Sequence, residues 1–120
     1  MRVLLLEDDP FLKFDLAQMI TEMGHEVVGP FQEEDAAAKA VQEIGCDAAI
    51  LDYNLGGGRD SACVGDLLIQ QSVPFAFTTG HSRDYLPERF AEISVIEKPY
   101  RDHEIEDFVS RVSGPERLAE

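Results

Sequence analysis

The chain has 120 residues and carries 10 Lys and Arg against 24 Asp and Glu, a formal net charge of −14 at pH 7. Because this charge repels the phosphates of nucleic acids and of anionic membranes, neither is expected as a direct partner. The length suits one domain with its own core, and no apolar run approaches the roughly 18 residues that a membrane-spanning helix needs. The N-terminus lacks a cleavable signal pattern, which favours a cytoplasmic protein.

The two cysteines, Cys46 and Cys63, stand far apart, outside any CxxC motif or Cys/His cluster. This spacing predicts reduced, mostly buried thiols rather than a disulfide or a zinc site.

Five short apolar segments alternate along the chain with longer segments of helical periodicity. Since they lack polar alternation, most are typical of parallel strands that are covered on both faces. The predicted strands are residues 3–6, 26–29, 48–51, 75–77 and 94–96.

The segments between these strands carry apolar stripes at helical spacing. The predicted helices lie around residues 12–23, which Gly24 closes, 37–44, which Gly45 closes, 64–68 and 105–112. The fourth crossover, around residues 85–93, has the weakest pattern, and Pro87 confines any helix to a start near that residue. We expect a short helix there.

Five consecutive β-then-α units predict a doubly wound α/β fold, a five-stranded parallel sheet with helices on both faces. Ligands of such sheets bind beyond the carboxyl ends of the strands. The polar residues that follow the first, third, fourth and fifth predicted strands therefore converge: Glu7, Asp8 and Asp9; Asp52, Tyr53 and Asn54; Thr78 and Thr79; Lys98.

Clustered carboxylates without Cys or His are ligands for a hard cation, and an open oxygen site suits Mg²⁺ better than Zn²⁺. Asp52 ends the most apolar strand and is the candidate nucleophile toward phosphorus. Glu7 and Asp8 are candidates to hold Mg²⁺, and Asn54 would add its backbone carbonyl. Thr79 and Lys98 are candidates to contact the phosphoryl oxygens.

Four segments of the chain resemble the receiver domains of two-component response regulators, in that family's order and spacing. They are Leu6-Glu7-Asp8-Asp9-Pro10, Leu51-Asp52-Tyr53-Asn54-Leu55, Thr79-Gly80 and Glu97-Lys98-Pro99-Tyr100. The resemblance implies a flavodoxin-like (βα)5 fold with strand order 2-1-3-4-5. It also implies a phosphoryl group on Asp52, transferred from a histidine kinase or histidine phosphotransfer protein, and Mg²⁺ bound by Glu7, Asp8, Asp52 and Asn54. Thr79 and Lys98 would respond to phosphorylation, and a cis peptide would precede Pro99.

Three features depart from the common pattern of this family. Val95 stands where many receivers carry a switch tyrosine or phenylalanine. Residues 74–81 resemble the PFxFATGY signature of a single-domain subgroup, the so-called FAT GUY group, with Thr78 for its alanine and His81 for its tyrosine. Three glycines at 56–58 predict a flexible loop beside the phosphoacceptor.

We expect a receiver domain over residues 1–113 and a short tail over 114–120, without an output domain. Such a protein signals through contacts with a downstream protein or acts as a phosphate sink, and catalyses only its own phosphorylation and dephosphorylation. One alternative is a Mg²⁺-dependent phosphatase or phosphotransferase for small molecules, although Asn54 stands where such enzymes need an acidic residue. The other is a pseudo-receiver that binds partners without phosphorylation.

Overall fold

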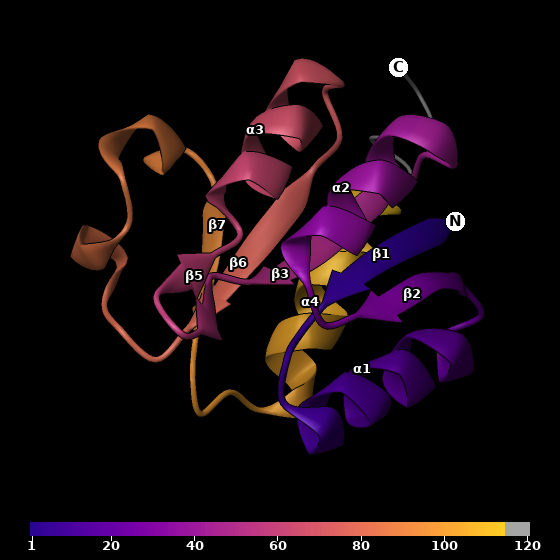
Figure 1. Ribbon diagram of the computed structural model, residues 1–120. Helices are drawn as coiled ribbons and strands as arrows, with labels where there is room; N and C mark the ends of the chain where they lie inside the picture. The colour runs from indigo at the N-terminus through magenta and orange to yellow at the C-terminus, as the bar shows by residue number, and fades with distance from the viewer. Residues whose placement is uncertain (115–120) are drawn as a thin grey trace.

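In the computed structural model, which describes residues 1–114, five parallel strands form the central sheet in the order β2-β1-β3-β6-β7 (Figure 1). This is the predicted order 2-1-3-4-5. The strands are β1 (Arg2–Leu6), β2 (Glu26–Phe31), β3 (Ala48–Asp52), β6 (Phe75–Thr79) and β7 (Ser94–Glu97). Every residue of β3 and β6 is buried, as expected for inner parallel strands covered on both faces.

Within residues 1–114, four α-helices cover the two faces of the sheet (Figure 1). On one face, α1 (Pro10–Glu22) and α4 (Asp102–Val112) pack on a core that includes Leu5, Ile50 and Ala76. On the other face, α2 (Glu34–Glu43) and α3 (Ala62–Gln70) pack on a core that includes Leu51 and Phe77. Alternate residues of each strand therefore serve opposite cores.

The first crossover begins immediately after the acidic end of β1. The Asp9 side chain accepts hydrogen bonds from the backbone N–H groups of Phe11, at 2.9 Å, and Leu12, at 3.2 Å. Pro10 occupies the first helical position, where a missing N–H costs nothing. Asp9 is thus the N-cap of α1, and its carboxylate is committed to the helix.

The fourth crossover is not an α-helix, which corrects the expected short helix. It consists of two 3-10 turns, η1 (Arg83–Tyr85) and η2 (Glu88–Phe90), joined through Leu86 and Pro87. Pro87 interrupts the segment, and the fully buried ring of Phe90 packs 4.9 Å from the ring of Phe77. The Arg83 guanidinium donates hydrogen bonds to the backbone carbonyls of Phe90, Ala91 and Ile93. These bonds connect the first 3-10 turn to the chain at the end of the second.

The glycine-rich segment after β3 forms a hairpin that the sequence analysis did not predict. Strands β4 (Asn54–Gly56) and β5 (Arg59–Asp60) pair antiparallel, and Gly56, Gly57 and Gly58 turn the chain with φ values of 81°, 59° and 77°. Arg59 donates two hydrogen bonds to Glu34 of α2, at 3.0 and 2.8 Å. The three glycines thus allow the positive φ angles of this turn. The bonds between Arg59 and Glu34 connect the hairpin to α2.

Other expectations concern the thiols, the membrane and the C-terminus. Both cysteines are free, but Cys63 is exposed and Cys46 only half-buried, so the prediction of mostly buried thiols is wrong for Cys63. None of the helices in residues 1–114 is long and apolar enough to cross a membrane. Nearly all of the predicted tail, residues 115–120, lies outside the described residues.

Candidate functional site

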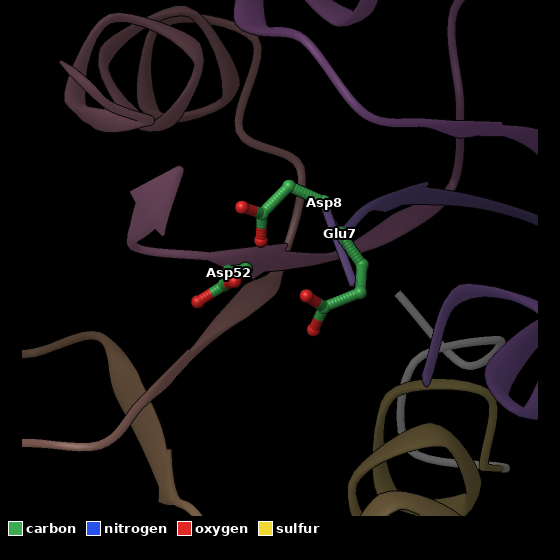
Figure 2. A group of neighbouring side chains, drawn as sticks. All are labelled: Glu7, Asp8 and Asp52. Atoms are coloured by element: carbon green, nitrogen blue, oxygen red, sulfur yellow. The ribbon is translucent and has the colours of Figure 1, made fainter. Parts of the chain in front are cut away.

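Three carboxylates meet at the carboxyl ends of two neighbouring strands (Figure 2). Glu7 and Asp8 follow β1, Asp52 ends β3, and one oxygen from each lies within 4.8 Å of the others. Pairing of Leu6 with Leu51 sets this register, since it makes the next residue of each strand a cross-strand neighbour. Glu7 and Asp52 are buried, whereas Asp8 is exposed. The cluster therefore has one side open to solvent.

Lys98, directly after β7, places its ammonium between the two buried carboxylates. Its Nζ lies 3.0 Å from Glu7 Oε1 and 3.2 Å from Asp52 Oδ2. The backbone N–H of Lys98 donates to the carbonyl of Thr79 at 2.7 Å, which continues the sheet beyond the end of β7. The peptide bond to Pro99 is cis, as the family resemblance implies. Burial lowers the pKa of Lys98, but the negative charges of Asp52 and Glu7 outweigh burial and raise it overall.

The surroundings of Asp52 make its ionised form costly. Burial and the neighbouring carboxylate of Glu7 raise the pKa of Asp52 to about 8, although Lys98 acts in the opposite direction. One ammonium does not balance three carboxylates, so the site favours a further positive charge. The second oxygen of Glu7 is already engaged, because Glu7 Oε2 accepts a hydrogen bond from the Asp9 N–H at 3.0 Å.

The hairpin of β4 and β5 lies beside the exposed carboxylate of Asp8. A Cβ added to Gly56 would lie 3.5 Å from Asp8 Oδ2, so β4 runs alongside Asp8. Asn54 is the first residue of β4 and is half-buried. The carbonyl proposed for Mg²⁺ thus belongs to a strand that contacts the acidic cluster.

Thr79 ends β6 next to the site, but its hydroxyl is engaged locally. Thr79 Oγ1 accepts a hydrogen bond from the backbone N–H of His81 at 3.1 Å, and the side chain is 1% exposed. Within residues 1–114, no hydrogen bond joins Thr79 to Asp52. The structure therefore brings Glu7, Asp8, Asp52 and Lys98 together and leaves Thr79 in a turn at the edge of the site.

A series of aromatic side chains connects Tyr53, directly after β3, with the fourth crossover. Tyr53, the residue after Asp52, lies edge-on to Tyr85, with ring centroids 6.1 Å apart, and Tyr85 stacks on His81 at 4.0 Å. Tyr53 is buried, whereas Tyr85 is half-exposed. The 3-10 turns therefore contact the residue next to Asp52.

Two buried hydroxyls near the carboxylates were not predicted as site groups. Thr78 Oγ1 and Tyr100 Oη are buried and have no hydrogen-bond partner among the described residues. In the sequence, Thr78 stands out only as a polar residue that follows a predicted strand. Strand alternation places Thr78 on the same face as Ala76, but only the register of β3 with β6 shows that Asp52 is its neighbour on that face.

The donor set fits a hard divalent cation. Its three carboxylates are close together, one is open to solvent, and no Cys or His of residues 1–114 joins them. Carboxylates held this close repel one another, and a cation would relieve that repulsion. The arrangement can thus bind a metal and present one buried carboxylate, Asp52, to an incoming group.

Comparison with known proteins identifies relatives over nearly the whole chain, although no family model matches. The chain is 30% identical over 112 residues to the phyllosphere-induced regulator PhyR of Methylorubrum extorquens, covering 91% of this chain and 42% of PhyR. It spans about half the length of the curated relatives it matches.

Two solved structures match over nearly the whole length of both chains. The solution structure of SdrG from Sphingomonas melonis Fr1 superposes with a TM-score of 0.80 at 31% identity, over 95% of this chain and 97% of SdrG. A response regulator receiver protein from Sinorhizobium medicae has a TM-score of 0.78 at 19% identity, over 93% of each chain, which supports the fold alone. Together with the sheet order and the four motif segments, these matches show that the chain belongs to the receiver domains of response regulators.

Proposed function

We propose that Asp52 accepts a phosphoryl group from a histidine kinase or a histidine phosphotransfer protein. The observation that carries this proposal is the environment of Asp52. It is a buried carboxylate at the end of an inner strand, 3.2 Å from Lys98 Nζ and clustered with Glu7 and Asp8. Membership of the receiver family supports the same assignment.

The proposed transfer is a displacement at phosphorus. A carboxylate oxygen of Asp52 bonds to the phosphorus of the donor phosphohistidine as the P–N bond breaks. The electron pair of that bond goes to the imidazole nitrogen, which then takes a proton from water. Asp52 must be ionised to react, and its raised pKa means that added positive charge favours the reactive form.

Glu7, Asp8, Asp52 and the Asn54 carbonyl would hold Mg²⁺, which would supply positive charge to neutralise the phosphoryl oxygens. Glu7 is also held by Lys98 and by the Asp9 N–H, so its carboxylate is oriented before any ligand arrives. The exposed side of the cluster, at Asp8, leaves room for a donor to approach.

Lys98 and Thr79 are the residues we expect to respond to phosphorylation. Lys98 already contacts Asp52 and would pair with a phosphoryl oxygen, whereas Thr79 would exchange its bond with the His81 N–H for one with the phosphoryl group. This exchange would move the start of the fourth crossover, whose aromatic side chains reach Tyr53. Signalling to a downstream protein would follow from that movement, whereas action as a phosphate sink would need only the phosphoryl transfer to Asp52. Assignment to the FAT GUY subgroup stays a prediction.

The test compares wild type with Asp52→Asn, using Asp107→Asn as a control at an exposed position on α4. Each protein is incubated with Mg²⁺ and a small phosphodonor, and intact mass is measured. We expect one added phosphoryl group on wild type and Asp107→Asn and none on Asp52→Asn. Absence of the added mass from wild type, while Mg²⁺ binding is retained, would favour the pseudo-receiver alternative.

A further inference from the structure

The face of the sheet that carries Asp52 also carries Thr78. In the parallel register, Asp52 of β3 pairs with Thr78 of β6, and Thr78 pairs with Ile96 of β7. Ile50, Ala76 and Ile96 all lie in the core beneath α1 and α4. Because side chains alternate along a strand, Asp52 and Thr78 point to that same side, as neighbours on strands about 4.8 Å apart.

Thr79 lies on the opposite face. It is two residues from Phe77, which packs in the core beneath α2 and α3, and it pairs with Glu97 rather than with Ile96. The two consecutive threonines therefore approach the end of β3 from different sides of the sheet. They are not equivalent hydroxyls.

The hydroxyl of Thr78 makes no hydrogen bond within residues 1–114. Thr78 is 1% exposed, and its Oγ1 has no hydrogen-bond partner among the described residues. A hydroxyl that is both buried and unpaired destabilises the state that contains it and favours any state in which it is paired. The carboxylate of Asp52 is the hydrogen-bond acceptor on the adjacent strand. Its Oδ2 already forms an ion pair with Lys98 Nζ, at 3.2 Å.

Phosphorylation changes the number of acceptors beside Thr78. A carboxylate offers two oxygens, whereas an aspartyl phosphate offers a carbonyl oxygen, a bridging oxygen and three phosphoryl oxygens. Lys98 already contacts both Glu7 and Asp52, so it cannot serve all of these acceptors. Thr78 provides a buried donor on the next strand, on the face where the Asp52 side chain lies.

Resting on the proposed function, we propose that Thr78 is a positioning residue, whose hydroxyl donates a hydrogen bond to the Asp52 side chain once that side chain carries its phosphoryl group. This bond fixes the orientation of the aspartyl group from the side of α1 and α4. Thr79 and Lys98 would then contact the terminal phosphoryl oxygens, while Thr78 holds the aspartyl group. Because Thr78 stands where the PFxFATGY signature has alanine, the hydroxyl is a feature of this chain rather than of the signature.

The surroundings of Tyr100 extend this polar layer. Tyr100 follows Lys98 by two residues and packs against the core beneath α1 and α4, and its buried hydroxyl has no hydrogen-bond partner within residues 1–114. Burial raises the pKa of Tyr100, and the negative charges of Glu7 and Asp52 raise it further. The negative charges of the site thus help to keep a second buried hydroxyl protonated. This hydroxyl lies on the same side of the sheet as that of Thr78.

The experiment measures the affinity of the full chain for beryllofluoride, a phosphoryl mimic, in the presence of Mg²⁺. Dissociation constants come from amide NMR titrations of wild type, Thr78→Val and Thr78→Ser, and urea unfolding is measured on each unliganded protein. Valine keeps the shape of threonine without the hydroxyl, whereas serine keeps the hydroxyl. We expect about tenfold weaker binding for Thr78→Val and binding within about twofold of wild type for Thr78→Ser. We also expect that Thr78→Val leaves the unliganded protein at least as resistant to urea as wild type.

Three results would overturn the proposal. Equal affinity of Thr78→Val and wild type would show that the hydroxyl is not used. Equal weakening in both variants would assign the effect to packing. Absence of beryllofluoride binding by wild type would overturn the proposed function, and the role of Thr78 with it, so the two failures are distinguishable.

Discussion

Lys98 Nζ lies 3.0 Å from Glu7 Oε1, although 91 residues separate the two in the chain. The Glu7 side chain is 1% exposed and that of Lys98 22% exposed, so the pair links the first and last strands of the fold in a largely dry environment. Removing one member of such a pair leaves the other charge without its partner. The contact therefore contributes to stability as well as to the site.

We expect Lys98→Met to lower the free energy of unfolding by about 1–3 kcal/mol, because the buried carboxylate of Glu7 loses its cationic partner. Lys39→Met makes the same chemical change at an exposed position on α2 and should stay within about 0.5 kcal/mol of wild type. Urea unfolding monitored by circular dichroism measures both. A Lys98→Met protein as stable as wild type would mean that the pair contributes nothing to folding.

The divalent cation gives a second prediction. Because three carboxylates repel one another, Mg²⁺ should raise the unfolding temperature of wild type, and chelation should reverse the rise. Asp8→Asn removes the exposed carboxylate without opening the core and relieves part of the repulsion, so without metal it should be at least as stable as wild type, and it should lose most of the rise. Asp107→Asn should behave as wild type. Calorimetric scans at constant ionic strength measure the effect, and an equal rise in Asp8→Asn would exclude Asp8 as a ligand.

Much of the site could be predicted from the sequence, because parallel strands bring their carboxyl ends to one edge. Knowing that residues 3–6 and 48–51 are neighbouring strands is enough to bring Glu7 close to Asp52. The face on which a hydroxyl lies requires the exact register. The sequence predicts Thr79 as a site residue, whereas the register places Thr78 on the same face as Asp52.

The parts that could not be predicted depend on contacts between distant residues. The fourth crossover retains helical apolar spacing, but its shape is set by the Arg83 guanidinium and the buried Phe90 ring, which periodicity does not encode. The hairpin likewise depends on Arg59 reaching Glu34 of α2. A run of three glycines shows only that such a turn is permitted.

Gly65 gives a prediction about packing between α3 and the fourth crossover. A Cβ at this position would lie 2.9 Å from Phe77 Cζ and 3.2 Å from Phe90 Cε1, and both rings are fully buried. Alanine favours a helix over glycine by about 1 kcal/mol, but overpacking costs about 1–3 kcal/mol. We expect Gly65→Ala to lower the free energy of unfolding by about 1 kcal/mol.

The matched test of that packing is the double variant Gly65→Ala/Phe90→Leu, measured in a cycle with both single variants. Leucine removes Phe90 Cε1 and Cζ, two of the three atoms nearest the added methyl group, so the double variant should be more stable than the sum of the single effects predicts. Purely additive effects would show that Phe90 is not the group that the methyl displaces.

Arg83 holds the fourth crossover by donating to the carbonyls of Phe90, Ala91 and Ile93. Its replacement by lysine keeps the charge but loses the planar group that reaches several carbonyls at once. Because these bonds lie in an exposed loop, we expect global stability to change by less than about 1 kcal/mol. Hydrogen exchange should instead accelerate locally over residues 83–93 in Arg83→Lys. Unchanged protection there would mean that Phe90 alone holds the segment.

The two thiols should differ in reactivity and in its dependence on pH. Burial raises the pKa of Cys46 to about 11, and the nearby carboxylate of Asp47 contributes. Since the thiolate is the reactive form, only about one Cys46 in a thousand is reactive at pH 8, and the rate should keep rising tenfold per pH unit up to about pH 10. The pKa of Cys63 is also raised, by burial and then by Glu34, but this thiol is exposed. A thiol reagent should therefore modify Cys63 first, as peptide mapping of wild type against Cys63→Ser can establish. Faster modification of Cys46 would show that the loop between α2 and β3, which contains Cys46, opens often enough to expose this thiol.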